Sequence, residues 1–249
     1  MRAKSRPSDN RSSLRTALLT AAIVFATGTG AAQANLLTNG GFDNSTGFVV
    51  GGCGSDPGCM LLAPGSTTIT GWTVNGTGGD GVAWIGPGNP YNIAAQGGSY
   101  SLDLTGYSNG APFNGVQQSV ATTAGTEYEL QFYLGTDISQ TGTYSIDACG
   151  GSTCQTFSVN VATVTGGTPV NAWTLETLDF TATGASSVIS LLGNGSGGNQ
   201  DYIGLDTVSL NSIATATTPL PAALPLFAGG LAGMGLFGWR RKRKILFTD

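Results

Sequence analysis

Residues 127–134 alternate between apolar and polar side chains, and this pattern restricts the fold more than any other feature of the chain. Every second residue from Tyr128 to Leu134 is apolar, whereas Glu127, Glu129 and Gln131 are polar. Successive side chains of a β-strand point to opposite faces, so the segment predicts a half-buried strand. Residues 156–161 repeat the alternation.

Similar short segments recur along the chain between stretches rich in Gly, Asn and Ser. The sequence has 40 Gly among 249 residues and no amphipathic helix of useful length between its two ends, which favours strands joined by tight turns. We therefore expect an all-β fold, an antiparallel β-sandwich over residues 35–212. The further predicted strands are Thr67–Val74, Gly81–Ile85, Ser99–Leu104, Gly115–Val120, Trp173–Thr181, Ser187–Leu192 and Asp206–Leu210.

The charged residues are distributed very unevenly. All ten Lys and Arg lie near the two ends, so residues 35–239 hold none, yet this stretch carries every acidic residue except Asp9 and Asp249. Such a domain repels phosphate backbones, which argues against nucleic-acid binding. The chain also has no His, the usual general base and zinc ligand. Only carboxylate-based catalysis stays open, and because no catalytic signature accompanies it we expect no enzyme.

The N-terminus is typical of a secretory signal. Basic residues precede the apolar run Ala17–Ala26, and the segment Ala32 to Ala34 offers small residues where signal peptidase cleaves. We predict a signal peptide with a helix over residues 1–34, removed after Ala34. The alternative is a retained membrane helix, for which the apolar run is short.

The C-terminus predicts a transmembrane helix after a short linker at residues 213–218. The segment 220–239 has no charge and is just long enough to cross a bilayer as a helix. A basic cluster follows it and would stay on the cytoplasmic side. The cluster consists of Arg240, Arg241, Lys242, Arg243 and Lys244.

Residues 219–244 combine a Pro-containing motif, a glycine-rich apolar segment and an Arg-rich end, and this order resembles the PEP-CTERM sorting signal. The motif would be Pro219, Leu220 and Pro221, with Leu in place of the usual Glu. The resemblance implies a Gram-negative bacterium, an inner-membrane intermediate and cleavage by an exosortase. The mature protein would then be at the cell surface or extracellular. A plain tail anchor without processing is the alternative.

The four cysteines form two close pairs. Cys53 and Cys59 are separated by five residues, and Cys149 and Cys154 by four. In an oxidising compartment the simplest interpretation is two local disulfides that pin loops, each stabilising the fold by about 2–3 kcal/mol. A zinc site is the rival interpretation, which export and the lack of His disfavour.

Several motifs, in order along the chain, resemble the strands of galactose-binding-like jelly rolls. They are Asn35–Asp43 as the opening strand, Gly71 and Trp72, Ala95–Leu104, Gly115–Val120, Ala124–Tyr128, and Ile203–Leu210 as the closing strand. The set is most similar to the family of domain-of-unknown-function 642, known from plant cell walls and bacterial surfaces, and it also resembles carbohydrate-binding modules of the same fold. The resemblance implies a jelly-roll sandwich whose first and last strands are neighbours.

In several such jelly rolls the opening acidic residue and the closing aspartate help to hold a structural calcium ion. The matching residues are Asp43 and Asp206, and backbone carbonyls would have to supply the other ligands. Ordinary solvated carboxylates are the alternative. No other cofactor is expected.

Sugar binding requires exposed aromatic platforms with polar groups beside them. The candidates are Trp84, Tyr91 and Tyr107, which lie in or near turn-rich segments, whereas Trp72 and Trp173 are expected in the core. Partial burial is the alternative for each candidate. We therefore weigh two functions: a non-catalytic module that binds exopolysaccharide or wall glycan, and a structural surface or matrix protein without a specific ligand.

Overall fold

Eleven β-strands account for the regular secondary structure of the part of the chain that the computed structural model describes, which is residues 34–50, 53, 57–78, 81–106, 112–137, 142–160, 171–196 and 202–213. The strands are β1 (Cys59–Leu62), β2 (Thr73–Gly76), β3 (Val82–Ile85), β4 (Ser101–Asp103), β5 (Asn114–Ala121), β6 (Glu127–Asp137), β7 (Thr143–Gly150), β8 (Thr153–Asn160), β9 (Asn171–Thr181), β10 (Ser186–Ser196) and β11 (Ile203–Ser212).

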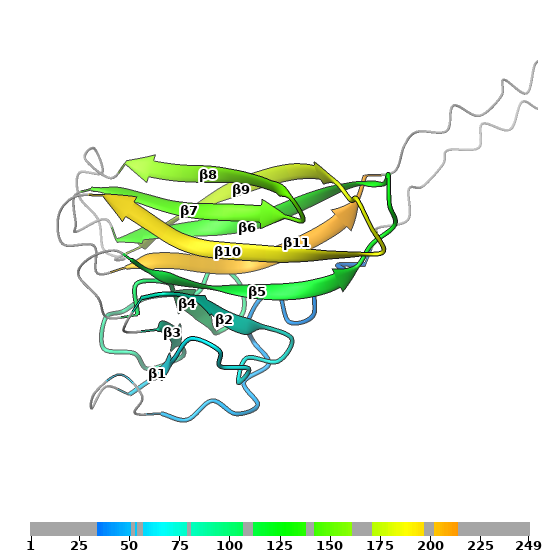
Figure 1. The fold of residues 1–249 in the computed structure, drawn as a ribbon. Coiled ribbons are helices and arrows are strands. Elements are labelled where there is room, and N and C mark those ends of the chain that lie inside the picture. The colour runs from blue at the N-terminus through cyan, green and yellow to red at the C-terminus, as the bar shows by residue number, and fades with distance from the viewer. Residues whose placement is uncertain are drawn as a thin grey trace, which may run out of the picture. The chain divides into compact units, whose positions relative to one another are not determined.

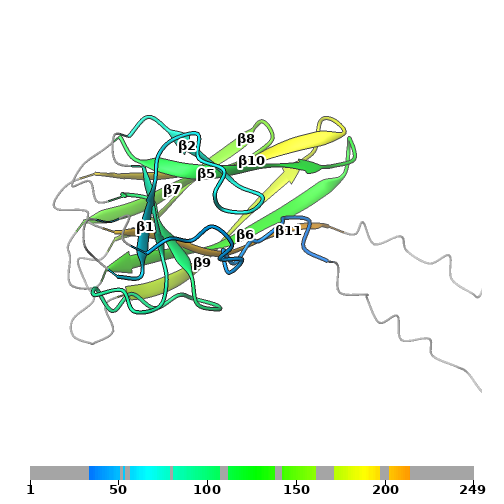
Figure 2. The same ribbon diagram turned by 90° about the horizontal axis from the view of Figure 1, so that it is seen from below.

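The strands form two antiparallel sheets that lie face to face (Figure 2). One sheet has six strands in the order β1-β3-β4-β11-β6-β9, and the other has five in the order β2-β5-β10-β7-β8. Successive strands change sheet at most connections (Figure 1), as in a jelly roll. The expected all-β antiparallel sandwich is therefore confirmed.

The alternation in residues 127–134 places one face of β6 in the core between the sheets. Tyr128, Leu130, Phe132 and Leu134 are all at most 4% exposed. Leu130 pairs with Leu178 of β9 on the same inner face. Burial of each such side chain contributes about 1.5–3 kcal/mol relative to leaving it exposed, so the period-two pattern alone fixes which face of β6 is inside.

Two of the predicted strands differ from the structure. The segment Asn35–Asp43 is not a strand but a series of turns, with positive φ at Asn39 and Phe42. It still lies beside β11, because the N–H of Leu36 donates to the carbonyl of Leu210 at 2.9 Å. Gly40 allows this close approach, since a Cβ at that position would meet the carbonyl oxygen of Val208 at 1.9 Å.

The predicted strand Thr67–Val74 is also wrong over most of its length. Only its last two residues belong to β2. A turn precedes them, closed by the N–H of Trp72 on the carbonyl of Ile69, and Gly71 has a φ of 85° there. Two strands were missed altogether: β1, which is short, and β7, whose inner residues Tyr144, Ile146 and Ala148 do alternate with polar ones.

Both predicted disulfides are present. Cys53 is bonded to Cys59 at the start of β1, and Cys149 is bonded to Cys154 across the β7–β8 hairpin. In the hairpin the two cysteines are direct partners in the strand register, beside the turn at Gly151. Each disulfide therefore pins a short local loop, as the spacing predicted.

Several predicted features lie outside the described residues. They are the signal segment up to residue 33, the sorting motif, the apolar segment 220–239, the basic cluster and Tyr107. Among the residues that are described, no helix is long and apolar enough to cross a membrane.

Candidate functional site

The outer face of the five-stranded sheet has a hollow of about 390 Å³ over β7, β8 and β10. Outward-pointing residues of adjacent strands meet there in register. Asp147 is the cross-strand partner of both Thr156 and Leu192. The residues that line the hollow are Asp147, Cys149, Cys154, Gln155, Thr156, Ser190 and Leu192.

Hydrogen bonds from both neighbouring strands hold the carboxylate of Asp147 in place. The hydroxyl of Thr156 on β8 donates to Oδ1, and Nδ2 of Asn194 on β10 donates to Oδ2 at 3.0 Å. Each carboxylate oxygen can accept a further hydrogen bond, so Asp147 can still serve two donors of a ligand. Leu192 and the Cys149–Cys154 disulfide add apolar surface beside it.

A second polar group continues this face toward β5 and β2. Nδ2 of Asn75 donates to Oγ of Ser190 at 2.8 Å and to Oε1 of Gln117 at 3.4 Å. Oδ1 of Asn75 is buried and has no hydrogen-bond partner. A buried acceptor without a donor is unfavourable by about 1–3 kcal/mol, so this atom would gain from a hydroxyl donor. The face is therefore an ordered array of hydroxyl, amide and carboxylate groups.

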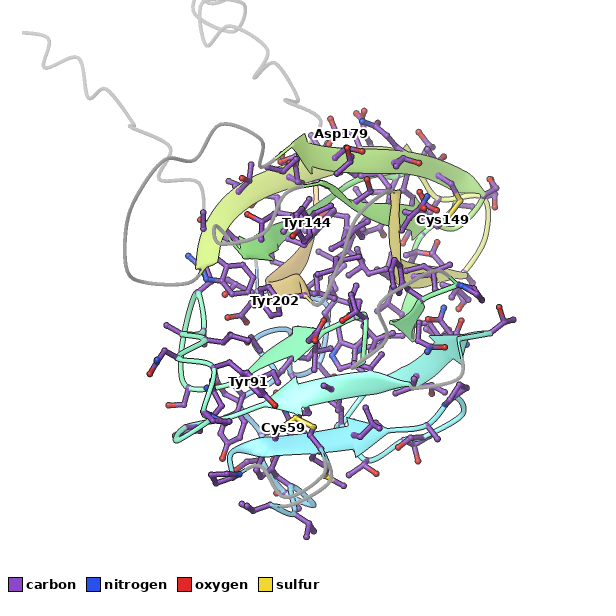
Figure 3. The ribbon with its side chains drawn as sticks, turned by 90° about the vertical axis from the view of Figure 1, so that its left-hand side faces the viewer. Cys59, Tyr91, Tyr144, Cys149, Asp179 and Tyr202 are labelled. Atoms are coloured by element: carbon purple, nitrogen blue, oxygen red, sulfur yellow. A yellow bond between two sulfur atoms is a disulfide. The ribbon has the colours of Figure 1, made fainter. Side chains whose placement is uncertain are left out.

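The outer face of the six-stranded sheet is different, because aromatic residues gather on it. Trp173 of β9 pairs with Gly135 of β6, and its indole covers that glycine. The indole Nε1 donates to the carbonyl of Ala94 at 3.3 Å, and the ring meets Tyr202 edge-on at 6.5 Å between centroids. Tyr202 and Cys149 lie on opposite sides of the sandwich (Figure 3).

The structure brings Asp43 and Asp206 to one loop. Oδ2 of Asp206 accepts the N–H groups of Gln96 at 2.8 Å and Gly97 at 3.0 Å, and its Oδ1 accepts the N–H of Thr207. Oδ1 of Asp43 accepts the N–H groups of residues 99 and 100 at 2.7 and 3.1 Å. The two carboxylates together therefore clamp residues 96–100.

A β-bulge makes this clamp possible. The register between β11 and β6 shifts between Asp206 and Ser209, and Thr207 has a φ of 48°. A bulge re-aims the side chain at its position, here toward the loop. Burial raises the pKa of Asp206 to about 6, and the negative charge of Asp43 adds to this rise. The N–H groups of Gly97, Thr207 and Gln96 lower the pKa but do not cancel the effect of burial.

The donor set of this clamp does not favour calcium. Calcium takes six to eight oxygen ligands, whereas three of the four carboxylate oxygens of Asp43 and Asp206 face backbone N–H groups. Among the described residues, no group of three or more His, Cys, Asp or Glu is placed to hold a metal ion. The hydrogen bonds to the backbone of residues 96–100 explain the positions of both aspartates, and the calcium site stays a prediction.

Trp84 is not an exposed platform, so that prediction is wrong. Its side chain is 0% exposed, and its Nε1 donates to the carbonyl of Phe42 at 3.2 Å. Its ring meets those of Phe48 and Tyr100 at 5.2 and 5.6 Å between centroids. All four residues of β3 are buried, so the Trp84 side chain is not accessible to a ligand in solvent. Tyr91, in contrast, is 37% exposed.

The expected burial of the two other tryptophans is confirmed for one of them. Trp72 is 2% exposed and donates its Nε1 to the carbonyl of Asn39. Trp173 is only half-buried, because its position in β9 points to the outer face. Neither Trp173 nor Asp147 was among the residues predicted from the sequence. Asp147 alternates with buried apolar neighbours on β7, which could have placed it on an outer face, whereas both neighbours of Trp173 on β9 are exposed and give no such signal.

The fold and these faces define a class: a disulfide-pinned antiparallel β-sandwich whose two outer faces carry different arrays, one polar and one aromatic. The particular family follows from the sequence match. Residues 35–204, about two thirds of the chain, match the family described as "Protein of unknown function (DUF642)". The chain belongs to this family.

A curated relative is halomucin of Haloquadratum walsbyi, 29% identical over 211 residues, which are 84% of this chain and 2% of halomucin. The chain thus spans only a small part of that relative's length. Among solved structures, TmCBM61 in complex with β-1,4-galactotriose is similar, with 17% identity, a TM-score of 0.42, and coverage of 73% of this chain and all of that one.

Two other solved structures are similar at a comparable level. The CBM22-1 xylan-binding domain of Paenibacillus barcinonensis Xyn10C has 16% identity and a TM-score of 0.36, covering 75% of this chain and all of that one. The K1 cleaved adhesin domain of Lys-gingipain from Porphyromonas gingivalis has 15% identity and a TM-score of 0.43, covering 63% and 99%.

Proposed function

We propose that this protein binds a neutral glycan, without catalysis, in the hollow of the five-stranded sheet. The observation that carries the proposal is the carboxylate of Asp147, held between Thr156 and Asn194 with acceptor capacity left over. Sugars present closely spaced hydroxyl donors, and a hydrogen bond to an ionised carboxylate contributes about 1.5–3 kcal/mol. Ser190 and Gln155 supply further donors and acceptors beside it.

The charge of the chain supports a neutral ligand. Residues 35–239 hold no Lys or Arg, so no cation there can pair with a phosphate, sulfate or uronate group. Asp147 would repel such groups in the hollow itself. A polymer of neutral sugars carries hydroxyl donors and no charge, and it therefore matches the lining. Exopolysaccharide and wall glycan are the proposed sources.

The protein would meet such a glycan outside the cytoplasm. Two local disulfides favour an oxidising compartment. Export would begin with signal peptidase and end at the PEP-CTERM-like signal, where an exosortase releases the domain from its membrane helix. The mature protein would be at the cell surface or extracellular.

The processing proposal predicts the mass of the mature protein. The protein isolated from its own cells should start at Asn35 and lack the cluster Arg240–Lys244. Intact-mass spectrometry of the envelope and medium fractions measures both ends at once. A mature form that retains the basic cluster contradicts exosortase processing and leaves a plain tail anchor.

The binding proposal predicts that Asp147→Asn weakens retention on a neutral polymer about 10- to 100-fold, which corresponds to one or two lost charge-assisted hydrogen bonds. The measurement is affinity electrophoresis of the purified protein in gels with β-1,4-galactan, xylan, the organism's own exopolysaccharide, or polygalacturonate as the anionic comparison. Wild-type protein should be retarded by at least one neutral polymer and not by polygalacturonate.

The matched control is Glu127→Gln. Glu127 is an exposed carboxylate at the start of β6, on the other sheet and outside the hollow. The control removes the same charge and should leave retention unchanged. Equal retention of wild-type protein and Asp147→Asn on every polymer contradicts the site. No saturable retention of the wild-type protein supports the alternative, a structural matrix protein without a specific ligand.

A further inference from the structure

Trp173 is held flat against the outer face of the six-stranded sheet. A Cβ on Gly135 would meet the six-membered ring of the indole at 2.6 Å, so the ring rests on the backbone of β6 at the one position where no side chain intervenes. Its Nε1 is engaged by the carbonyl of Ala94, and Tyr202 covers one side. The side chain of Trp173 is nevertheless partly exposed.

The loop that supplies the Ala94 carbonyl is itself fixed. The side chain of Asn89 donates to the carbonyls of Gly86 and Ile93 and accepts the N–H of Ile93. The carboxylates of Asp206 and Asp43 hold the residues that follow, 96–100. The indole is therefore positioned before any ligand arrives, and little side-chain entropy is left to lose on binding.

Trp173 begins a stripe of outward residues along β6 and β9. The next pair on the same face is Tyr133 with Leu175, which is 48% exposed. The pairs that follow are Gln131 with Thr177 and Glu129 with Asp179. Consecutive pairs are two residues apart, or about 7 Å along the strands, so the stripe changes from aromatic to amide and hydroxyl to carboxylate over about 20 Å.

We propose that this stripe is a second binding site for a neutral glycan chain, with one sugar ring stacked on Trp173. The aromatic end offers a fixed apolar surface for the C–H face of a sugar ring. The polar and acidic end offers acceptors for its hydroxyl groups. The proposal rests on the proposed function for the type of ligand, but it uses none of the residues of the hollow.

The polar residues of the stripe match the hydroxyl groups of a glycan. A partner that covers Gln131, Thr177 and the two neighbouring carboxylates, Glu129 and Asp179, has to supply hydrogen-bond donors to these groups. Sugar hydroxyls can donate to each of these groups without being charged. With the hollow on the five-stranded sheet and the stripe on the other sheet, one molecule can bind two glycan chains and cross-link them.

The test counts sites and measures cross-linking separately. Titration calorimetry of the purified protein with hexasaccharides of galactan or xylan, whichever polymer it binds, gives the stoichiometry. Turbidity or viscosity with the full-length polymer reports cross-links. Wild-type protein should bind two equivalents and raise the viscosity. Trp173→Ala and Asp147→Asn should each bind one equivalent and lose the viscosity increase, while the double variant binds none.

Leu175→Asp is the second variant, because it places a charge in the stripe without uncovering Gly135. It should behave as Trp173→Ala does, and far-ultraviolet circular dichroism checks that both are folded. If the Leu175 variant binds two equivalents and still cross-links, the glycan does not contact the stripe, and this result overturns the second site. Any loss in Trp173→Ala would then come from uncovering Gly135. If the wild-type protein binds only one equivalent, and Asp147→Asn abolishes that binding, the second site is overturned and the proposed function stands. Binding of neither sugar overturns both.

Discussion

Replacing Trp84 with alanine should lower the free energy of unfolding by about 4 kcal/mol. The side chain is fully buried, it packs edge-on against Phe48, and its Nε1 donates to the carbonyl of Phe42. Its removal would leave a large cavity and a buried carbonyl without its donor. Urea unfolding followed by circular dichroism measures the change.

The matched comparison is Tyr91→Ala, since both residues were sequence candidates for a sugar platform. Tyr91 is 37% exposed, so its removal should change the free energy of unfolding by less than about 1 kcal/mol. The folded fraction of Trp84→Ala should bind glycan as the wild-type protein does. A stable Trp84→Ala protein that has lost binding would show that Trp84 contacts the ligand, and would contradict its place in the core.

Replacing Asp206 with alanine should destabilise the protein by about 2 kcal/mol at pH 8, because three backbone N–H groups lose their acceptor. The loss should grow at lower pH. The pKa of Asp206 in the folded protein is raised to about 6, above its value in the unfolded chain, so the folded state binds the proton more tightly. This group therefore adds stability as the pH falls from 8 to 4.5, by about 2 kcal/mol.

The variant lacks that proton site, so the difference between wild-type and Asp206→Ala should rise to about 4 kcal/mol at pH 4.5. Denaturant unfolding of both proteins at several pH values gives this difference in the free energy of unfolding, in which contributions from carboxyl groups far from Asp206 cancel. If the difference in free energy of unfolding between wild-type protein and Asp206→Ala becomes smaller on acidification, the folded protein stabilises the charged form of Asp206, which contradicts the prediction. Repeating the series with calcium and with a chelator tests the calcium site, because bound calcium would stabilise the wild-type protein alone.

The prediction of the fold succeeded where local patterns decide the structure. The alternation along β6 defined its buried face, because a strand has a period of two and burial rewards only one register. The cysteine spacing predicted both disulfides, because four or five intervening residues place the two thiols close together. The strand predicted at Thr67–Val74 failed, because Gly71 turns the chain just before β2.

The candidate sites were less predictable. Tyr91 and Trp84 look alike in the sequence, since both follow Gly-rich turns, yet β3 lies buried between β1 and β4 whereas Tyr91 lies in a surface loop. The alternation along β7 could place Asp147 on an outer face, but it could not mark Asp147 as a site residue, because its hydrogen-bond partners Thr156 and Asn194 come from two other strands. Asp206 and Asp43 were paired only through the family resemblance.

Residue types and their order are enough to predict that this chain makes strands, which face of its clearest strand is buried, and that residues 35–239 offer no Lys or Arg to a ligand. These properties depend on side-chain period and residue type, which are local. In contrast, the burial of Trp84 and the position of Trp173 on an outer face, opposite Gly135, follow from the packing of the strands. The environment of a side chain depends on which residue the partner strand places across from it, and that register is set by the packing of the whole sandwich.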